Sequence, residues 1–359
     1  MNSVNSARPL RGAVLGCGHI SPFHLRAWAQ IEDIEIVALA NRTLDKAQAR
    51  AREFGVPLEH VYSDYRELLE CERPDFVDVA TAPQVHREQT EFAARYGCHV
   101  LCQKPLAPTL EDAYAMAAAC QAAGVLLSVN ENWRWRSWYR ELKRLLQAGT
   151  IGRPRYVRIA RHRNETLPRP DGGLPDLFVQ QPYTLEMDRL ILLEWGIHLI
   201  DVLRFLFGEV RSVYARMDKV SPLARGEDRA VVVLDLCGVA GVLDLSWATL
   251  DGEATHSRLE HVTIEGDDGA LELLPGDGDV LQARTKSGSW RRPAMHGTPA
   301  EEHQASYTAA QRHFVECLRA GALPETSVSD NLKTLEVTFA AYESAARNQT
   351  VVLGGRDAA

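Results

Sequence analysis

The sequence predicts an α/β protein in which an N-terminal Rossmann domain, a doubly wound parallel sheet, is followed by an α+β domain with a mostly antiparallel sheet. Over the first 130 residues, short apolar runs alternate with helical patterns, which is typical of a parallel sheet covered by helices on both faces. Beyond Asn130 the expected strands are joined by short Gly/Asp turns such as Cys237-Gly238, which indicate antiparallel hairpins. The length of 359 residues also suggests two domains, which we expect at 1–130 and 131–359.

Each element of the first domain is expected from its own pattern. A buried strand at residues 12–15 leads into a glycine turn and a helix that continues to about Gln30. The helix expected at 43–54 carries alanines and charges suited to one buried and one exposed face. The other strands are expected at 34–40, 76–80, 99–102 and 125–129, and the other helices at 86–96 and 111–123.

The second domain begins with a helix expected at 138–146, where Leu142, Leu145 and Leu146 share one face. A Pro/Gly-rich loop is expected at 168–182. The remaining helices are expected at 190–207, 307–320 and 329–347, and the strands at 155–161, 210–217, 230–237, 240–247, 260–265, 270–274 and 279–285.

Composition excludes several classes of function. The formal net charge of −8 argues against a broad surface for nucleic acid or anionic membranes. The most apolar long segment, 191–207, carries Glu194, His198, Asp201 and Arg204, so it does not fit a membrane span. The seven cysteines form no CxxC pair and no signal peptide precedes the first strand, so we expect reduced thiols in a cytoplasmic protein without a metal site.

The strongest motif is the glycine turn directly after the first strand, Gly16-Cys17-Gly18-His19-Ile20-Ser21. A turn that needs glycine can arise for backbone reasons alone, but one that follows a strand and opens a helix indicates dinucleotide binding. Gly16 permits the tight turn, and Gly18 lets the backbone approach a pyrophosphate that N–H groups at the helix N-terminus hold. We expect Gly16, Gly18, His19 and Ile20 to contact the cofactor.

The end of the second strand bears on the choice between NAD and NADP. A carboxylate there would bind the ribose 2′-OH of NAD and repel a 2′-phosphate. This chain has Asn41 and Arg42 instead, and a guanidinium suits a phosphate, which favours NADP. The alternative is that Arg42 is solvated in the first turn of the helix or stacks on adenine, so NAD stays open.

Two segments carry residues suited to proton transfer. Lys104 follows a strand of the Rossmann sheet, where ligands bind, and could orient or polarise a substrate hydroxyl; the alternative is a surface lysine that caps a turn. Glu194 and His198 are four residues apart on an expected helix, so the carboxylate could orient a histidine that acts as general base. The alternative for His198 is a satisfied structural histidine.

The chain resembles the glucose-fructose oxidoreductase / inositol dehydrogenase (Gfo/Idh/MocA) family over essentially its whole length. The matching segments, in order, are Gly16-Cys17-Gly18-His19-Ile20, Ala80-Thr81-Ala82-Pro83-Gln84-Val85-His86, Gln103-Lys104-Pro105, Gly196-Ile197-His198-Leu199-Ile200-Asp201 and the helix around 331–346. The resemblance implies that the second domain has a large open sheet used for homodimer or homotetramer contacts, and that a sugar, cyclitol or related polyol meets the nicotinamide in a cleft between the domains. It implies that Lys104 and His198 are the catalytic pair and that Thr81, Pro83, His86 and Gln103 lie at the cofactor.

Two positions depart from the family pattern. Gln103 stands where the family's Glu-Lys-Pro motif has glutamate, so a negative charge beside Lys104 is lost. Glu194 stands where the family usually has aspartate, so its carboxylate is set on a longer arm against His198. Both changes keep hydrogen-bonding capacity, so redox chemistry is expected to survive. Pro105 follows a strand end, a position suited to a cis peptide.

Four further residues are expected at the substrate, and contact with the cofactor is the alternative for Asn132 and Arg134. Asn132 and Arg134 follow the last Rossmann strand, Arg161 ends a strand, and Tyr183 lies in the Pro/Gly-rich loop. A loop without function is the alternative for Tyr183. The Trp/Arg run at 133–140 looks like a nucleic-acid patch, but the acidic chain favours a packed entry to the second domain.

These observations predict an NAD(P)-dependent oxidoreductase that exchanges hydride with a secondary alcohol or ketone of a sugar-like substrate. The roles expected are proton transfer for His198, polarisation of the substrate oxygen for Lys104 and orientation of His198 for Glu194. One alternative is an enzyme that cleaves or isomerises glycosides with tightly bound NAD. The other is a dinucleotide sensor without catalysis.

Overall fold

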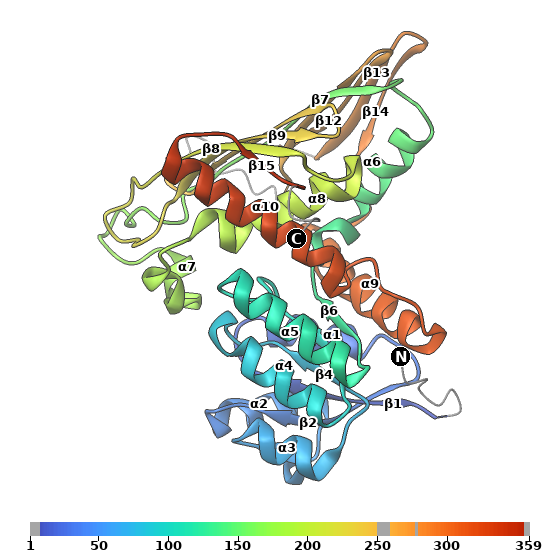
Figure 1. Ribbon diagram of the computed structural model, residues 1–359, viewed down its shortest axis with the longest axis vertical. Coiled ribbons are helices and arrows are strands. Elements are labelled where there is room, and N and C mark those ends of the chain that lie inside the picture. Colours follow the sequence, from blue (N-terminus) through green and yellow to red (C-terminus); the bar gives the residue numbers. More distant parts are fainter. Residues whose placement is uncertain (1–7, 250–258, 277–278, 355–359) are drawn as a thin grey trace. The chain divides into compact units, whose positions relative to one another are not determined.

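The computed structural model describes residues 8–249, 259–276 and 279–354, and the chain divides into two compact units (Figure 1). Unit 1 comprises Met1–Trp135 and His303–Leu335, and unit 2 comprises Arg136–Glu302 and Glu336–Ala359. Unit 1 thus includes residues 303–335 in addition to the N-terminal part of the chain. These units are compact groups of contacts and are not a test of the domain division expected at residue 130. The domain boundary itself stays a prediction.

Unit 1 contains a six-stranded parallel sheet in the order β3-β2-β1-β4-β5-β6, which confirms the predicted Rossmann arrangement. Strand β3 was not predicted, because a strand of two residues leaves no pattern to recognise. The helix after it was not predicted either. The strands are β1 (Leu10–Leu15), β2 (Ile34–Ala40), β3 (Val61–Tyr62), β4 (Phe76–Val79), β5 (His99–Cys102) and β6 (Leu127–Val129).

Helices follow the strands of unit 1 and cover its sheet (Figure 1). Gly55 follows helix α2 and Gly124 follows helix α5 as C-caps, both in the left-handed conformation that glycine adopts without strain. The core is aromatic where Trp28, Phe76 and Phe314 meet, with ring centroids 4.8 Å apart for the first pair. The helices are α1 (Ser21–Trp28), α2 (Leu44–Phe54), α3 (Tyr65–Glu72), α4 (His86–Arg95) and α5 (Leu110–Ala123), with 3-10 turns η1 (Leu58–His60), η2 (Pro83–Val85) and η3 (Trp133–Trp135).

Unit 2 contains a nine-stranded sheet in the order β14-β13-β12-β11-β7-β10-β9-β8-β15. Strands β7 and β10 pair in parallel and the other neighbours pair antiparallel, which confirms the predicted open, mostly antiparallel sheet. The strands are β7 (Pro154–His162), β8 (Ser212–Asp218), β9 (Arg229–Leu236), β10 (Val239–Ser246), β11 (His261–Gly266), β12 (Gly269–Leu274), β13 (Val280–Thr285), β14 (Gly288–Pro293) and β15 (Val351–Val352).

The residues of β9 alternate between a buried and an exposed face of this sheet. On β9, Val232 and Leu234 are buried, whereas Val231 and Val233 are 45% and 43% exposed. Strand β14 was not predicted, because its residues lie mostly at the surface and lack the apolar alternation that marks a half-buried strand. Strand β15 was not predicted either, because two residues carry no pattern.

Helices α6 and α8 pack with each other, and α8 contacts β9 and β10. The expected loop at 168–182 contains a short helix, and the expected helix at 190–207 begins with a π-helical turn, so both predictions need correction. No helix in the described part of the chain is long and apolar enough to cross a membrane. The remaining helices and turns are α6 (Ser137–Gln147), α7 (Asp176–Gln180), the 3-10 turn η4 (Pro182–Glu186), the π-helical turn η5 (Leu192–Gly196), α8 (Ile197–Phe207), α9 (Pro299–Ala320) and α10 (Val328–Arg347).

Candidate active site

The glycine turn between β1 and α1 has the geometry that a pyrophosphate requires. Gly16 has a φ of 103°, and a Cβ there would lie 2.6 Å from the carbonyl oxygen of Ala80, so only glycine fits. Gly18 is exposed, and a Cβ there would meet nothing within 4 Å, which leaves open space beside the backbone. Helix α1 begins at Ser21 and turns its N-terminal N–H groups to this end. The turn therefore fits a dinucleotide.

Asn41 holds the shape of this turn. Its Oδ1 accepts a hydrogen bond from the Cys17 N–H at 3.0 Å, and its Nδ2 donates to the Thr43 carbonyl at 2.8 Å. Arg42 is exposed beside it. In the turn itself, His19 is exposed and Ile20 is the N-cap of α1. Their contacts with a cofactor stay predictions.

The segment after β4 is tied to the segment after β5 through a buried histidine. His86 Nε2 lies 3.0 Å from the Thr81 carbonyl, and His86 Nδ1 lies 3.1 Å from the Leu106 carbonyl. Burial lowers the pKa of His86, and the two carbonyls act against that shift. Thr81 Oγ1 donates to Gln89, and Pro83 opens the turn η2. The structure thus brings Thr81, Pro83 and His86 beside the strand end that carries Lys104.

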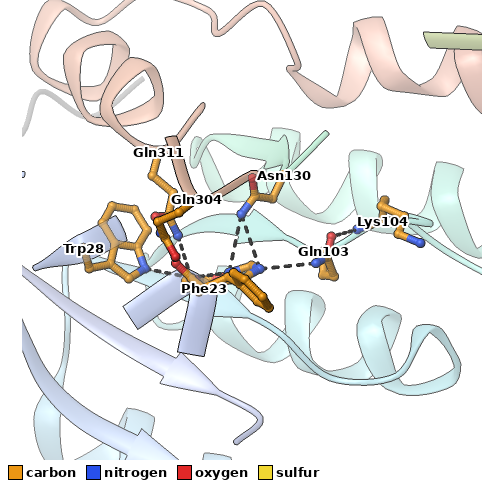
Figure 2. A network of polar contacts seen from close by, with 9 residues as sticks. Phe23, Trp28, Gln103, Lys104, Asn130, Gln304 and Gln311 are labelled. Atoms are coloured by element: carbon orange, nitrogen blue, oxygen red, sulfur yellow. Dashed lines mark hydrogen bonds and ion pairs between the residues drawn. The ribbon is translucent and has the colours of Figure 1, made fainter. Parts of the chain in front are cut away.

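Lys104 follows β5 directly and precedes a cis peptide bond to Pro105. Its backbone N–H donates to Gln103 Oε1 at 2.6 Å, and Gln103 Nε2 lies 3.2 Å from His24 Nε2 (Figure 2). Gln103 is buried and Lys104 is only partly so. The departure from glutamate at position 103 therefore places a neutral amide inside a buried network.

Asn132 and Arg134 are held by the C-terminal part of unit 1. Asn132 Nδ2 donates to Ser306 Oγ at 2.7 Å. The guanidinium of Arg134 donates to the Glu325 carbonyl at 2.9 Å and to Asp330 at 2.7 Å. Both side chains are nearly fully buried, so they anchor the segment 303–335. Their predicted contacts with substrate stay predictions.

In unit 2, Glu194 lies in the π-helical turn η5 and His198 in the first turn of α8. Both side chains are buried, with exposed fractions of 6% and 4%. The spacing argument assumed a regular α-helix, but Glu194 sits where the helix widens, a feature common at functional sites. The spacing of four between Glu194 and His198 therefore crosses the junction of a π-helical turn and an α-helix.

A carboxylate from outside the helix holds the start of this turn. Glu227 accepts hydrogen bonds from the N–H groups of Leu190 and Leu192 at 3.0 and 3.1 Å. Tyr342 donates its hydroxyl to Glu227 at 2.6 Å and accepts the Leu193 N–H at 3.1 Å. Sequence analysis missed Glu227 and Tyr342, since no motif connects them to residues 190–193.

Arg161 and Tyr183 both lie near the π-helical turn. The guanidinium of Arg161 stacks 4.4 Å from the centroid of Trp195 and donates to Glu260 at 2.7 Å. Burial lowers the pKa of Arg161 to about 10, although Glu260 acts in the opposite direction. Burial, and then the charge of Glu194, raise the pKa of Tyr183. Unit 2 thus gathers Arg161, Tyr183, Glu194 and His198 around one turn.

Comparison with known families matches most of unit 1 and a large part of unit 2. Residues 10–131 match the model of an oxidoreductase family with an NAD-binding Rossmann fold, and residues 139–272 match the GFO/IDH/MocA C-terminal domain. The chain belongs to the Gfo/Idh/MocA family of oxidoreductases. This confirms the resemblance inferred from the motifs.

Relatives of this family align over nearly the full chain. The D-apiose dehydrogenase of Paraburkholderia graminis is 37% identical over 99% of this chain and 93% of its own length. That of Rhizobium rhizogenes is 34% identical over 96% of this chain and 98% of its own. A crystal structure of an oxidoreductase from Agrobacterium radiobacter in complex with NAD+, L-tartaric acid and magnesium covers 96% of this chain and 98% of its own, with 34% identity and a TM-score of 0.88. The similarity therefore includes both units, and the chain is an oxidoreductase.

Proposed function

We propose that this Gfo/Idh/MocA oxidoreductase is an NAD(P)-dependent dehydrogenase of a sugar, acting on a CH–OH group or on the matching carbonyl. The observation that carries the proposal is the similarity to two D-apiose dehydrogenases over nearly the whole chain. A family relative of lower similarity, the myo-inositol 2-dehydrogenase of Thermotoga maritima, also acts on a polyhydroxylated ring. D-apiose is therefore the first substrate to test, and cyclitols are the second.

In this proposal Lys104 and His198 have different roles toward the substrate hydroxyl. The Lys104 ammonium donates a hydrogen bond to the substrate oxygen and stabilises negative charge that develops there. The His198 imidazole accepts the hydroxyl proton as general base, and Glu194 orients that imidazole. The nicotinamide supplies the hydride acceptor when the dinucleotide is bound at the turn of Gly16 and Gly18. Arg161, Tyr183, Asn132 and Arg134 are proposed to contribute to recognition of the remaining hydroxyls.

The test measures the turnover of D-apiose, other aldoses and inositols with NAD and with NADP. Turnover is monitored through the absorbance of the reduced cofactor. Turnover of at least one sugar is expected, and Lys104→Met and His198→Asn should each lower kcat by about a hundredfold or more. Lys46→Met, on the exposed surface of α2, is the matched control for the lysine. Unchanged turnover in Lys104→Met would refute the mechanism. Retained cofactor with product formation but no net reduced cofactor would favour transient oxidation instead.

For the cofactor, we propose that Arg42 favours NADP. Support comes from the exposed guanidinium and from Asn41, which replaces the carboxylate that would repel a 2′-phosphate and uses its amide to hold the turn. The family description and the Agrobacterium radiobacter structure name NAD, so both cofactors belong in the test. Arg42→Asp should weaken NADP binding more than NAD binding, whereas Arg52→Asp, at an exposed position of helix α2, should change neither. An unaltered preference in Arg42→Asp would contradict the proposal.

We also propose a homodimer or homotetramer that forms through the exposed face of the nine-stranded sheet. Two apolar side chains on β9, Val231 and Val233, support this surface because they are nearly half exposed. Sedimentation of Val231→Asp/Val233→Asp should show a smaller species than the unsubstituted chain; an unchanged mass would exclude this face. A cytoplasmic location is part of the proposal and is supported by seven cysteines that are all free thiols.

A further inference from the structure

A continuous line of buried hydrogen bonds connects the backbone of Lys104 with the interior of unit 1 (Figure 2). Lys104 N–H reaches Gln103 Oε1 at 2.6 Å, and Gln103 Nε2 lies 3.2 Å from His24 Nε2. His24 Nδ1 lies 2.8 and 3.0 Å from the two carboxylate oxygens of Asp78. His24 and Asp78 are both fully buried. Asp78 in β4, His24 in α1 and the two residues that follow β5, Gln103 and Lys104, therefore form one line.

The direction of every hydrogen bond in this line is fixed by its first member. A backbone N–H can only donate, so the atom 2.6 Å from it must be the oxygen of the Gln103 amide. The NH2 group of Gln103 then faces His24, and because it can only donate, His24 Nε2 must accept. A ring nitrogen that accepts carries no proton, so the single proton of His24 is on Nδ1, where it is donated to Asp78.

The surroundings of the line agree with this assignment. Asp78 also accepts hydrogen bonds from Trp28 Nε1 at 2.7 Å and from Gln311 Nε2 at 3.3 Å (Figure 2). Three donors around one carboxylate suit its ionised form, which only accepts. The amide nitrogen of Asn130 lies 3.4 Å from His24 Nδ1 and 3.5 Å from His24 Nε2, so this contact does not distinguish the two ring nitrogens. The ring of Tyr307 packs against the imidazole, with centroids 5.3 Å apart.

We propose that His24, held by Asp78 as the neutral Nδ1–H tautomer, is a positioning residue that fixes Gln103 and, through it, the backbone of Lys104. The role for the reaction rests on the proposed function of Lys104. His24 does not touch the substrate in this proposal. His24 contributes to the reaction because the Lys104 side chain meets the substrate oxygen in the correct position only when the Lys104 backbone is held rigidly.

In this proposal the amide at position 103 allows His24 Nε2 to remain unprotonated. A carboxylate at 103 would offer two oxygens that only accept, one toward Lys104 N–H and one toward His24. His24 Nε2 would then need a proton, so the imidazole would become an imidazolium between two carboxylates. Gln103→Glu should therefore change the protonation of His24 although the substituted side chain keeps its size and shape.

Nitrogen NMR of the full chain labelled with ¹⁵N-histidine tests the tautomer directly. We expect one protonated nitrogen, Nδ1, and one unprotonated nitrogen, Nε2, for His24 at neutral pH, with the signal assigned by its loss in His24→Asn. In Gln103→Glu both nitrogens should be protonated. A protonated Nε2 in the unsubstituted chain would overturn the proposal. This readout needs no substrate, so it stands even if the proposed reaction fails.

Steady-state kinetics test the positioning role. Gln103→Met and His24→Asn should each lower kcat by about tenfold with little change in KM, because displacement of a catalytic group by about 1 Å costs up to about a hundredfold. The double variant should be no slower than the slower single variant, since both break the same line. His99→Asn is the control, because His99 is buried in the same sheet and accepts the Leu126 N–H but lies outside the line. Full activity of both Gln103→Met and His24→Asn would refute the role, whereas activity in Lys104→Met would instead refute the proposed function.

Discussion

Two carboxylates, one in each unit, hold the segments that carry the proposed catalytic residues, and they do so in different ways. Asp78 in unit 1 acts through two side chains, His24 and Gln103, before the backbone of Lys104 is reached. Glu227 in unit 2 binds the backbone directly, at the N–H groups of Leu190 and Leu192. Asp78 is fully buried, whereas Glu227 is partly exposed.

The difference follows from the elements that the carboxylates support. A strand end in a parallel sheet has its backbone groups paired with neighbouring strands, as Gln103 N–H is with Val79, so a remote carboxylate must act through side chains. A helix start has N–H groups without partners inside the helix, and a carboxylate can accept from them directly. The unit 1 arrangement therefore depends on the tautomer of His24 and the orientation of the Gln103 amide, while the unit 2 arrangement depends on one carboxyl group, that of Glu227.

Removal of Asp78 should have the largest effect. Asp78→Ala leaves three buried donors, on His24, Trp28 and Gln311, without their acceptor. We expect a loss of about 3–5 kcal/mol in the free energy of unfolding, measured by urea denaturation. Asp75→Ala, at a more exposed carboxylate of the same unit, should cost less. If Asp78→Ala and Asp75→Ala lose the same free energy of unfolding, the buried Asp78 network stabilises unit 1 no more than an exposed ion pair does.

Glu227→Ala should have a smaller effect on stability. It leaves the N–H groups of Leu190 and Leu192 without their carboxylate, and we expect a cost of roughly 2–3 kcal/mol. Because η5 carries Glu194, kcat should fall as well, even at temperatures where the variant is fully folded. Asp188→Ala, at an exposed carboxylate just before the turn, is the control and should leave both quantities unchanged. A normal kcat in Glu227→Ala would mean that the turn needs no outside support.

A third carboxylate, Glu72 of unit 1, is buried but holds no segment that carries a proposed catalytic residue, so its removal tests stability without a change in positioning. Burial alone would raise the pKa of Glu72, but hydrogen bonds from Tyr62 and His60 and the nearby charges of His60 and Arg11 lower it below 4.5. A lowered pKa means that the stabilisation is complete above pH 4.5 and is lost as the pH falls through the folded-state pKa.

Glu72→Gln should therefore cost about 1–3 kcal/mol at pH 7 and progressively less as the pH falls below 4.5. Urea unfolding curves of the unsubstituted chain and of Glu72→Gln, recorded from about pH 3 to about pH 7, measure this difference in the free energy of unfolding. Turnover at pH 7 should be unchanged, since Glu72 contacts no candidate catalytic residue. A cost that stays constant with pH would show that the charge of Glu72 is not what stabilises unit 1.

Tyr342→Phe should have the smallest effect. It removes one hydroxyl that donates to Glu227 and accepts from Leu193, at a cost of about 1 kcal/mol. The remaining hydrogen bonds of Glu227 should keep η5 in place, so kcat should fall by less than in Glu227→Ala. Tyr214→Phe, which removes an exposed hydroxyl bonded to Asn348, is the control. If Tyr342→Phe lowers kcat as much as Glu227→Ala does, the tyrosine rather than the carboxylate governs the turn.

Local sequence patterns predicted most of the fold. The strand expected at 99–102 is observed as His99–Cys102, and the helix expected at 43–54 as Leu44–Phe54. Elements with short or exposed sequences escaped, among them β3 and β14. The π-helical turn at Leu192–Gly196 escaped because its apolar residues fit an α-helical pattern equally well.

By itself, the sequence determined the alternation that builds each sheet, the glycine turn, the family and the candidate residues Lys104, Glu194 and His198. These depend on neighbours a few positions apart, and a single chain displays such spacings directly. Only the tertiary structure decided which polar groups meet. Asp78 and Gln103 come together because β4 and β5 are neighbours in the sheet, while His24 and Gln311 reach Asp78 from helices α1 and α9. Glu227 likewise reaches the N–H groups of Leu190 and Leu192 across a gap of more than thirty residues. No local pattern encodes those distances, because the hydrogen bonds join residues that are distant in sequence.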